Sequence, residues 1–322
     1  MKRTPRHTLL RTAAALTLLL PALTACTIVS RTVPAADEPI TFASFLPDVT
    51  KAGVVESAGD MSEFAVWGWH TDADATGANQ TAIFDGEKVY RDLPGSSWTY
   101  DVPRFWVDGH YDFYALHPYP ADGSGVTAGV TADGITSITL NSPNAGIDLM
   151  TATATRNYPG DGDGAVAFTF DHLLSRVSIQ AEAGAGDVQI TFLTFSGMYD
   201  GGNYNPATAS WDFTGRAADG CISLSEGSRP LTVTPGEPVP VLPDLLMIPQ
   251  TPGSGCGITL RWTLDGTEQD HVSLAVPADP AWTAAQHYIY TLKLNDVVDV
   301  TLNINVLDWE EDNYSMNFND WN

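Results

Sequence analysis

The sequence predicts an all-β protein built from many short antiparallel strands. Two segments show the clearest pattern, GITLRWTL (residues 257–264) and VDVTLNINV (residues 298–306). Apolar and polar side chains alternate along both, as they do in a strand with one buried face. Clusters of Gly, Pro, Asp and Asn separate these and other candidate strands, and no segment beyond the first 25 residues sustains the period of an amphipathic helix. This combination favours β-sandwiches.

The remaining strands are expected where β-branched and aromatic residues gather between turn residues. In chain order they are residues 64–70, 109–117, 135–140, 166–170, 176–181 and 288–294. The strand that ends at residue 264 should turn back at Asp265-Gly266, a dipeptide typical of tight hairpins. The glycine-rich runs at residues 159–164 and 200–203 are expected to be loops.

The first 25 residues have the three parts of a bacterial export signal. Basic side chains come first, a short apolar run follows at residues 13–20, and small residues then lead to Cys26. The apolar run is too short to span a bilayer, which takes roughly 20 residues. Leu-Thr-Ala directly before Cys26 looks like a lipobox, so we expect Cys26 to be lipidated and to anchor the mature chain to a membrane. Ordinary secretion, with Cys26 a bystander, is the alternative.

Charge excludes one class of partner. The formal net charge is −24, and it becomes −28 without the first 25 residues, which contain four basic and no acidic side chains. So acidic a protein repels the phosphate backbone, so no nucleic acid partner is expected.

Chain length predicts two domains, because roughly 290 residues after the signal exceed what one hydrophobic core usually serves. We expect a signal peptide at residues 1–25, a lipidated linker at 26–38 and two β-sandwiches. The sandwiches would comprise residues 39–172 and 173–322, with the division in the middle of the chain.

Candidate chemical groups do not combine into a catalytic or metal site, and no cofactor is predicted. Beyond the signal, the histidines lack zinc-binding spacing and are expected mostly at the surface or at the rim of a pocket. They are His70, His110, His117, His172, His271 and His287. Asp161 and Asp163 on a glycine-rich loop lack the other ligands of a calcium site, so a solvated turn is favoured. No Ser occupies the centre of GxSxG.

Two features leave alternatives open. Cys221 and Cys256 could form one disulfide in an oxidising compartment, or both could pack as small unpaired hydrophobic residues. Aromatic residues are concentrated in the first half of the chain, which suggests a glycan platform. However, Trp67/Trp69 and Tyr111/Phe113 have the two-residue spacing of one strand face, which favours a place in the core.

Seven segments behind the lipobox span nearly the whole mature chain. They are ITFASFLPDVTKAG (40–53), FAVWGWH (64–70), SSWTYDVPRFWVDGHYDFYALHPY (96–119), GIDLMTATA (146–154), FTFDHLLSRVSIQAE (168–182), LLMIPQT (245–251) and the segment from HYIYTLKL to VTLNINVLDW (287–309). Together, and in family order, these segments resemble the Bacteroides-type fimbrillins and minor-fimbrillin-like lipoproteins.

The resemblance implies two tandem transthyretin-like β-sandwiches, exported as a lipoprotein and assembled into surface pili. In this family a protease cuts after a basic residue beyond the first strand, and a strand from another subunit fills the open groove. Such β-augmentation is physically sound, because the incoming strand satisfies exposed backbone groups and apolar pockets.

Carried over to this chain, the resemblance implies that residues 40–45 are the displaced first strand, with Ile40, Phe42 and Phe45 as its marker residues. The cut would follow Lys51, whereas Arg31 lies upstream of the strand and cutting there would only release the lipid. The best-known polymerising members are cut after Arg, so Lys51 is a departure. The donor strand would be residues 314–322, whose alternate side chains are Tyr314, Met316 and Phe318.

The expected function is therefore that of a non-enzymatic pilus subunit or adhesin at the outer membrane or in the fimbrium. Its partners would be other pilus subunits, outer-membrane lipid through Cys26, and a host or glycan ligand. The alternative is a monomeric surface lipoprotein that binds glycans or host ligands.

Overall fold

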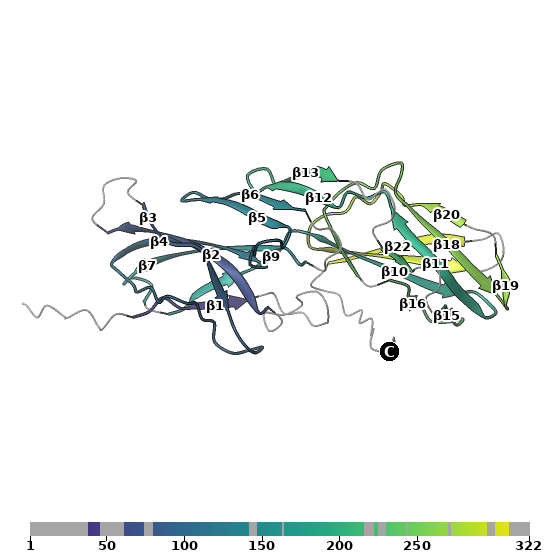
Figure 1. Cartoon of the computed structure of the whole chain (residues 1–322), viewed down its shortest axis with the longest axis horizontal. Helices are drawn as coiled ribbons and strands as arrows, with labels where there is room; N and C mark the ends of the chain where they lie inside the picture. Colours follow the sequence, from purple (N-terminus) through teal and green to yellow (C-terminus); the bar gives the residue numbers. More distant parts are fainter. Residues whose placement is uncertain are drawn as a thin grey trace, which may run out of the picture. The chain divides into compact units, whose positions relative to one another are not determined.

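A computed structural model describes residues 38–45, 61–73, 80–141, 147–162, 164–215, 222–224, 230–242, 244–269, 272–294 and 300–308. Every regular element in these ranges is a β-strand, and the strands form five sheets (Figure 1). These ranges include no helix long and apolar enough to cross a membrane. The fold class is therefore all-β, as the alternating sequence pattern predicts.

The central sheet of the first half has the strand order β3-β2-β4-β7-β9 and is antiparallel throughout. Its strands are β2 (Glu63–Asp72), β3 (Gln80–Tyr90), β4 (Gly109–His117), β7 (Met150–Tyr158) and β9 (Asp171–His172). Strand β2 is buried on both faces, because Phe64 and Val66 enter one core cluster and Ala65 and Trp67 enter another. The run FAVW is therefore apolar without alternation.

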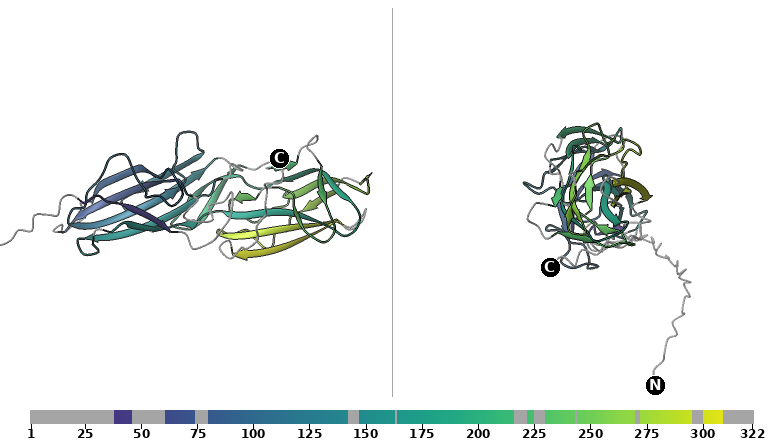
Figure 2. Two further views of the ribbon diagram at one scale, coloured as in Figure 1. Left: turned by 90° about the horizontal axis from the view of Figure 1, so that it is seen from below. Right: turned by 90° about the vertical axis from the view of Figure 1, so that its right-hand side faces the viewer.

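One face of the central sheet packs against a two-stranded parallel sheet made of β1 (Phe42–Phe45) and β8 (Val166–Thr169). Figure 2 shows β1, in purple, alongside the blue and teal strands of this part of the chain. The core between them is rich in aromatic residues. It contains Ile40, Phe42, Phe64, Phe84, Trp106, Tyr111, Phe113, Phe168 and Phe170.

The opposite core cluster lies against a second antiparallel sheet, with the strand order β13-β12-β6-β5. These strands are β5 (Val126–Thr131), β6 (Gly134–Leu140), β12 (Gly201–Asn205) and β13 (Ser210–Gly215). The prediction of a loop at residues 200–203 is wrong, because β12 begins at Gly201. A Cβ atom at Gly202 would lie 2.9 Å from the carbonyl oxygen of Asp212, so this glycine permits close strand approach.

The other two sheets enclose a separate core in the second half of the chain. One has the order β16-β10-β21-β22, with β17 also paired to β10; the other has the order β14-β11-β18-β19, with β15 on β11 and β20 on β18. The strands of the first are β10 (Ser175–Ala183), β16 (Val239–Pro240), β17 (Leu245–Met247), β21 (Gln286–Leu294) and β22 (Val300–Asp308). Those of the second are β11 (Val188–Ser196), β14 (Ile222–Leu224), β15 (Leu231–Val233), β18 (Gly257–Leu264), β19 (Thr267–Glu268) and β20 (Val272–Ala275).

The hairpin expected after residue 264 is present. Asp265 and Gly266 form a two-residue loop between β18 and β19, with φ angles of 48° and 77°. Positive φ at both positions is what a tight hairpin matching the strand twist requires. The division into sandwiches at residues 39–172 and 173–322 stays a prediction, and β12 from the second range pairs with β6 from the first.

Candidate functional site

The first strand lies between two segments and is hydrogen-bonded to both. On one side β1 runs parallel to β8, and the amide of Val166 donates to the carbonyl oxygen of Thr41 at 2.8 Å. On the other side Ile40 donates its amide to the carbonyl oxygen of Arg104, also at 2.8 Å. Residues 38–45 therefore occupy a groove that supplies backbone partners at both edges.

Two side chains from this segment fill the groove. Ile40 is 1% exposed and Phe42 is 5% exposed. The Phe42 ring contacts five other aromatic rings, with centroid distances from 5.4 to 6.4 Å; these are Phe64, Phe84, Tyr100, Phe113 and Phe168. Edge-to-face and offset contacts of this kind add to the free energy gained from apolar burial. The groove is thus an aromatic pocket that the first strand plugs.

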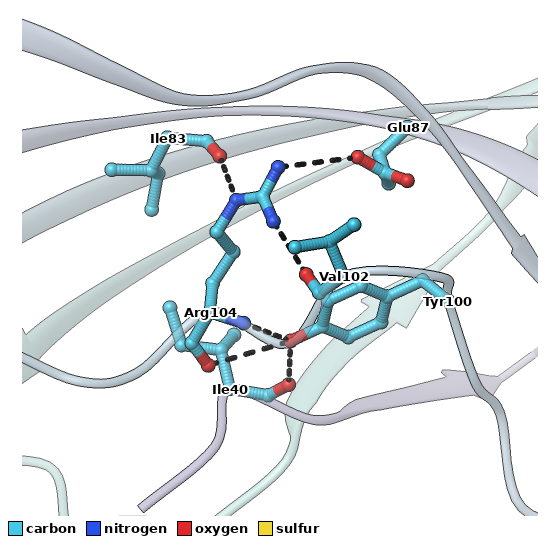
Figure 3. A network of polar contacts seen from close by, with 6 residues as sticks. All are labelled: Ile40, Ile83, Glu87, Tyr100, Val102 and Arg104. Atoms are coloured by element: carbon cyan, nitrogen blue, oxygen red, sulfur yellow. Dashed lines mark hydrogen bonds and ion pairs between the residues drawn. The ribbon is translucent and has the colours of Figure 1, made fainter. Parts of the chain in front are cut away.

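Tyr100 fixes the first strand through a main-chain atom (Figure 3). Its hydroxyl donates to the carbonyl oxygen of Ile40 at 2.7 Å and accepts from the amide of Arg104 at 3.1 Å. Burial raises the pKa of Tyr100, although the hydrogen bond to the Arg104 backbone acts the other way. The hydroxyl therefore keeps its proton and remains a donor. Because it contacts a backbone oxygen, it would hold any strand placed there.

Arg104 ties the groove wall to the central sheet. Its guanidinium donates to the carbonyl oxygen of Ile83 at 3.0 Å and lies 3.4 Å from a carboxylate oxygen of Glu87. It also donates to the carbonyl oxygen of Val102. One planar group thus joins β3, which carries Ile83 and Glu87, to the segment that carries Tyr100 and fixes that segment.

The far end of the groove offers a different contact. The indole N–H of Trp98 donates to the hydroxyl oxygen of Ser44 at 3.2 Å, and the Arg91 guanidinium lies 4.3 Å from the Trp98 ring centroid. From its start to its end the first strand thus presents Ile40, Phe42 and Ser44 to the groove. The groove accepts an aliphatic side chain, an aromatic ring and a small hydrogen-bond acceptor, in that order.

Replacing Tyr100 with phenylalanine should lower the free energy of unfolding by about 1 kcal/mol, because the ring stays and one hydrogen bond to Ile40 is lost. Amide hydrogen exchange at Val166, which bonds to Thr41, should become faster. Tyr114→Phe is the matched control, since its hydroxyl bonds to the Ala132 carbonyl outside the groove. Equal acceleration at Val166 in both variants would refute the specific role of Tyr100.

Most of the other predicted site residues lie outside the described residues. These are Cys26, Arg31, Lys51, Cys221, Tyr314, Met316 and Phe318. Phe45 lies within β1. Cys256 is buried, and its sulfur lies 3.1 Å from the carbonyl oxygen of Gly197. Its pairing with Cys221, the lipid anchor and the processing sites remain predictions.

Four histidines are buried, contrary to the expectation of a location at the surface or at the rim of a pocket. They are His70, His117, His172 and His287. His172 contacts the buried carboxylate of Asp148 at 2.8 Å. His117 contacts the carbonyl oxygen of Glu63 at 2.7 Å, and burial lowers its pKa. Hydrogen bonds to polar partners from distant parts of the chain offset the cost of burying these imidazoles. A local sequence pattern does not reveal such distant partners.

A buried polar cluster in the second half was also missed from sequence. Asp244 accepts hydrogen bonds from Arg176 and from the hydroxyl of Ser178, and the same hydroxyl lies 2.5 Å from Nε2 of His287. The cluster has the residue types of a catalytic triad in a different order. In a triad histidine lies between the other two, whereas here serine does. The hydrogen bonds connect β10, β21 and the segment before β17, and so they stabilise the packing of these elements.

The remaining chemical candidates have structural explanations. The Asp161 carboxylate accepts the amide of Asn157 at 2.7 Å and so closes its own turn. Across the described ranges, no group of three or more His, Cys, Asp or Glu side chains could hold a metal ion. Tyr111 and Phe113 are at most 1% exposed and Trp67 is 8% exposed, so these aromatic residues belong to the core and not to a glycan platform.

Comparison with solved structures reveals the same fold in three crystal structures from Bacteroides. A fimbrial protein from Bacteroides vulgatus ATCC 8482 is 16% identical, with a TM-score of 0.62 over 84% of this chain and 99% of that one. Candidate cell adhesion proteins from Bacteroides ovatus ATCC 8483 and Bacteroides uniformis ATCC 8492 have TM-scores of 0.52 and 0.51, at 16% and 18% identity. Both matches cover 85% of this chain and 99% of the other.

Sequence comparison identifies the family directly. None of the curated proteins matches this sequence significantly. The family model described as fimbrillin-like matches residues 50–309, which is most of the chain and includes the groove walls but not β1. The chain therefore belongs to the fimbrillin-like family.

Proposed function

We propose that the protein is a pilus subunit or adhesin of the cell surface, exported as a lipoprotein and assembled by proteolysis-triggered strand exchange. Its family and the fimbrial and cell adhesion proteins with the same fold support the general role. The proposed role is structural and not catalytic. Cys26 would attach the chain to the outer membrane, and the partners would be other pilus subunits, with a host or glycan ligand bound in addition.

The observation that carries the proposal is the way β1 is held. Among the described residues it is the first strand, and residues 46–62 lie between it and β2. A single cut there, after Lys51, would leave β1 bound by hydrogen bonds and packing alone. Before the cut, β1 is part of the same chain and therefore has a high effective concentration at the groove. After the cut this advantage is lost, and a strand from another molecule could compete with β1 for the groove.

An empty groove would be energetically unfavourable. The Val166 amide, the Arg104 carbonyl and the Tyr100 hydroxyl would lose their partners, and the aromatic pocket would face water. A donor with alternating apolar side chains restores both kinds of contact. Residues 314–322 have this pattern, with Tyr314, Met316 and Phe318 on one side.

The test uses protein taken from its native cell envelope. N-terminal sequencing should find a chain that begins at Ala52, after cleavage at Lys51, in the polymeric fraction and lipidated Cys26 in the unprocessed fraction. Lys51→Gln should keep the protein monomeric, and so should deletion of residues 314–322. Polymers that form from uncut chains would contradict the cleavage step, and polymers formed without residues 314–322 would contradict the donor assignment.

A further inference from the structure

The groove has an apolar rim that is exposed to solvent. We define the rim as Val102, Phe105 and Val107, whose exposed fractions are 57%, 45% and 57%. Between the last two, Trp106 is 7% exposed and enters the core, so Phe105 and Val107 point away from it. Three large apolar side chains within six residues are more than a scattered surface residue and indicate an interaction site.

The rim is held in place from below. The Tyr111 hydroxyl accepts from the Val107 amide at 2.7 Å and donates to the Val107 carbonyl oxygen at 2.8 Å. The Arg104 guanidinium binds the Val102 carbonyl oxygen (Figure 3). A surface whose backbone is already fixed loses little conformational entropy on binding, which favours docking.

The rim lies beside the start of the first strand. Trp106 donates its amide to the carbonyl oxygen of Glu38 at 3.0 Å, and Pro39 and Phe105 form an antiparallel bridge. The strand then continues past Ile40, which donates to the Arg104 carbonyl oxygen, toward Ser44, away from Phe105 and Val107. Any strand that replaces β1 in the same direction would therefore begin beside Phe105 and Val107.

We propose that the donor strand enters in the direction of β1 and that the body of the donor subunit, a second copy of this chain, docks on the rim. This inference rests on the proposed function. A donor in the direction of β1 would meet the Arg104 carbonyl, the Tyr100 hydroxyl and the Val166 amide in the order in which β1 meets them. Parallel and antiparallel strands space their hydrogen bonds differently, so a reversed donor would lose this match.

The reach of the donor requires close contact between the two bodies. Only five residues, 309–313, separate the end of β22 at Asp308 from Tyr314. Fully extended, five residues span about 17 Å. The donor's β22 must then lie near the start of the groove, and this strand carries Val306, an apolar side chain that is 39% exposed. Without the first 25 residues each copy has a formal net charge of −28, so apolar contacts and not charge attraction would hold such an interface.

The reverse direction would place the donor body at the other end of the groove. The exposed apolar residue on that side is Leu93, at 68% exposure. Leu93 follows Arg91, which packs on Trp98, the residue that contacts Ser44. One apolar side chain there, against Phe105 and Val107 beside the start of the strand, favours the direction of β1. Leu93 also supplies a matched control of the same chemical kind.

The experiment compares full-length chains cut between β1 and β2, at Lys51 or at an inserted protease site if Lys51 resists. The rim variant combines Val102→Ser, Phe105→Ser and Val107→Ser, and the control is Leu93→Ser. Two quantities are measured, the rate of polymer formation and the uptake of a synthetic peptide of residues 314–322. Thermal unfolding of each uncut variant checks that the fold is intact.

The rim variant should polymerise at least about tenfold more slowly, a loss that corresponds to the affinity of a small apolar contact. Its peptide uptake should stay within about twofold of that of the unsubstituted chain, because the free peptide has no attached subunit that could contact the rim. In the polymer, Phe105→Cys in one copy should form a disulfide with Val306→Cys in the next, and Leu93→Cys should not.

Each of the other outcomes would contradict one part of the proposal. Undiminished polymerisation of the rim variant would refute the interface while leaving strand exchange intact. A larger loss in Leu93→Ser would refute the direction. Failure of the unsubstituted chain both to take up peptide and to polymerise would refute the proposed function, and the interface with it. A lower thermal unfolding midpoint in the uncut rim variant, but not in the uncut control, would show that the rim stabilises the fold of its own chain and is not a docking surface.

Discussion

Replacing Phe42 with alanine should lower the free energy of unfolding by about 3–5 kcal/mol, the usual loss when a buried phenylalanine is truncated in a packed core. Phe42 is 5% exposed, and its ring contacts aromatic side chains from β2, β3, β4 and β8 as well as Tyr100. The walls of this cavity belong to a sheet and to the fixed segment around Arg104, so they can relax little. The loss should therefore fall near the upper part of that range.

The measurement is urea unfolding, with Thr41→Ala as control, because the Thr41 side chain on the adjacent position is exposed. The control should change stability by less than about 0.5 kcal/mol. If β1 is exchanged after cleavage, Phe42→Ala should also speed release of the cut strand, since the lost contacts hold it in the groove. A change below about 1 kcal/mol would show that Phe42 is not the main plug of the groove.

Local sequence patterns predicted eight strands that the structure contains, because side-chain alternation depends on neighbours along the chain, but β3, β7 and β11 were not predicted. In β22, Leu302 and Ile304 are half-buried while Asn303 and Asn305 are exposed, as the alternation indicates. Val306 departs from the pattern at the end of the strand, where it is exposed. Burial at that position depends on what covers the edge of the sheet, which the alternation does not encode.

Strand pairing could not be predicted in the same way. β1 pairs with β8 in parallel, and β10 pairs in parallel with β21, in each case with a partner more than a hundred residues away. The β12–β13 hairpin joins β6 through glycine-dependent close approach, whereas its glycines alone suggest a loop. Pairings over such distances are decided by the packing of whole faces, and a short window contains no record of it.

In the candidate site, too, the residues that follow a local pattern were predicted and those held by long-range contacts were not. The inward positions Ile40 and Phe42 follow from the resemblance and the alternation, and both are buried. Tyr100 and Arg104 were missed, although they hold the first strand. Their contacts are with main-chain oxygens of Ile40, Ile83 and Val102, and a main-chain acceptor leaves no trace in the sequence of side chains.

Replacing Asp244 with alanine should also lower the free energy of unfolding by about 3–5 kcal/mol, because it removes one partner of a buried ion pair with Arg176. The Arg176 guanidinium lies 2.5 Å from this carboxylate, and the two side chains are 6% and 10% exposed. Ser178, which also donates to Asp244, would lose an acceptor. Attraction between the charges is strong here because little water screens them.

The matched control lies on the same pair of strands. Glu182 on β10 and Lys293 on β21 form an ion pair at 3.4 Å, but their side chains are 33% and 38% exposed. Glu182→Ala should therefore cost no more than about 1 kcal/mol, since water and ions screen the pair and solvate the remaining lysine. Urea unfolding of both variants at low and high salt separates the cases. The Glu182 effect should shrink with salt, and the Asp244 effect should persist because Arg176 stays buried. Equal losses in the two variants would mean that the buried cluster contributes no more to stability than a surface ion pair.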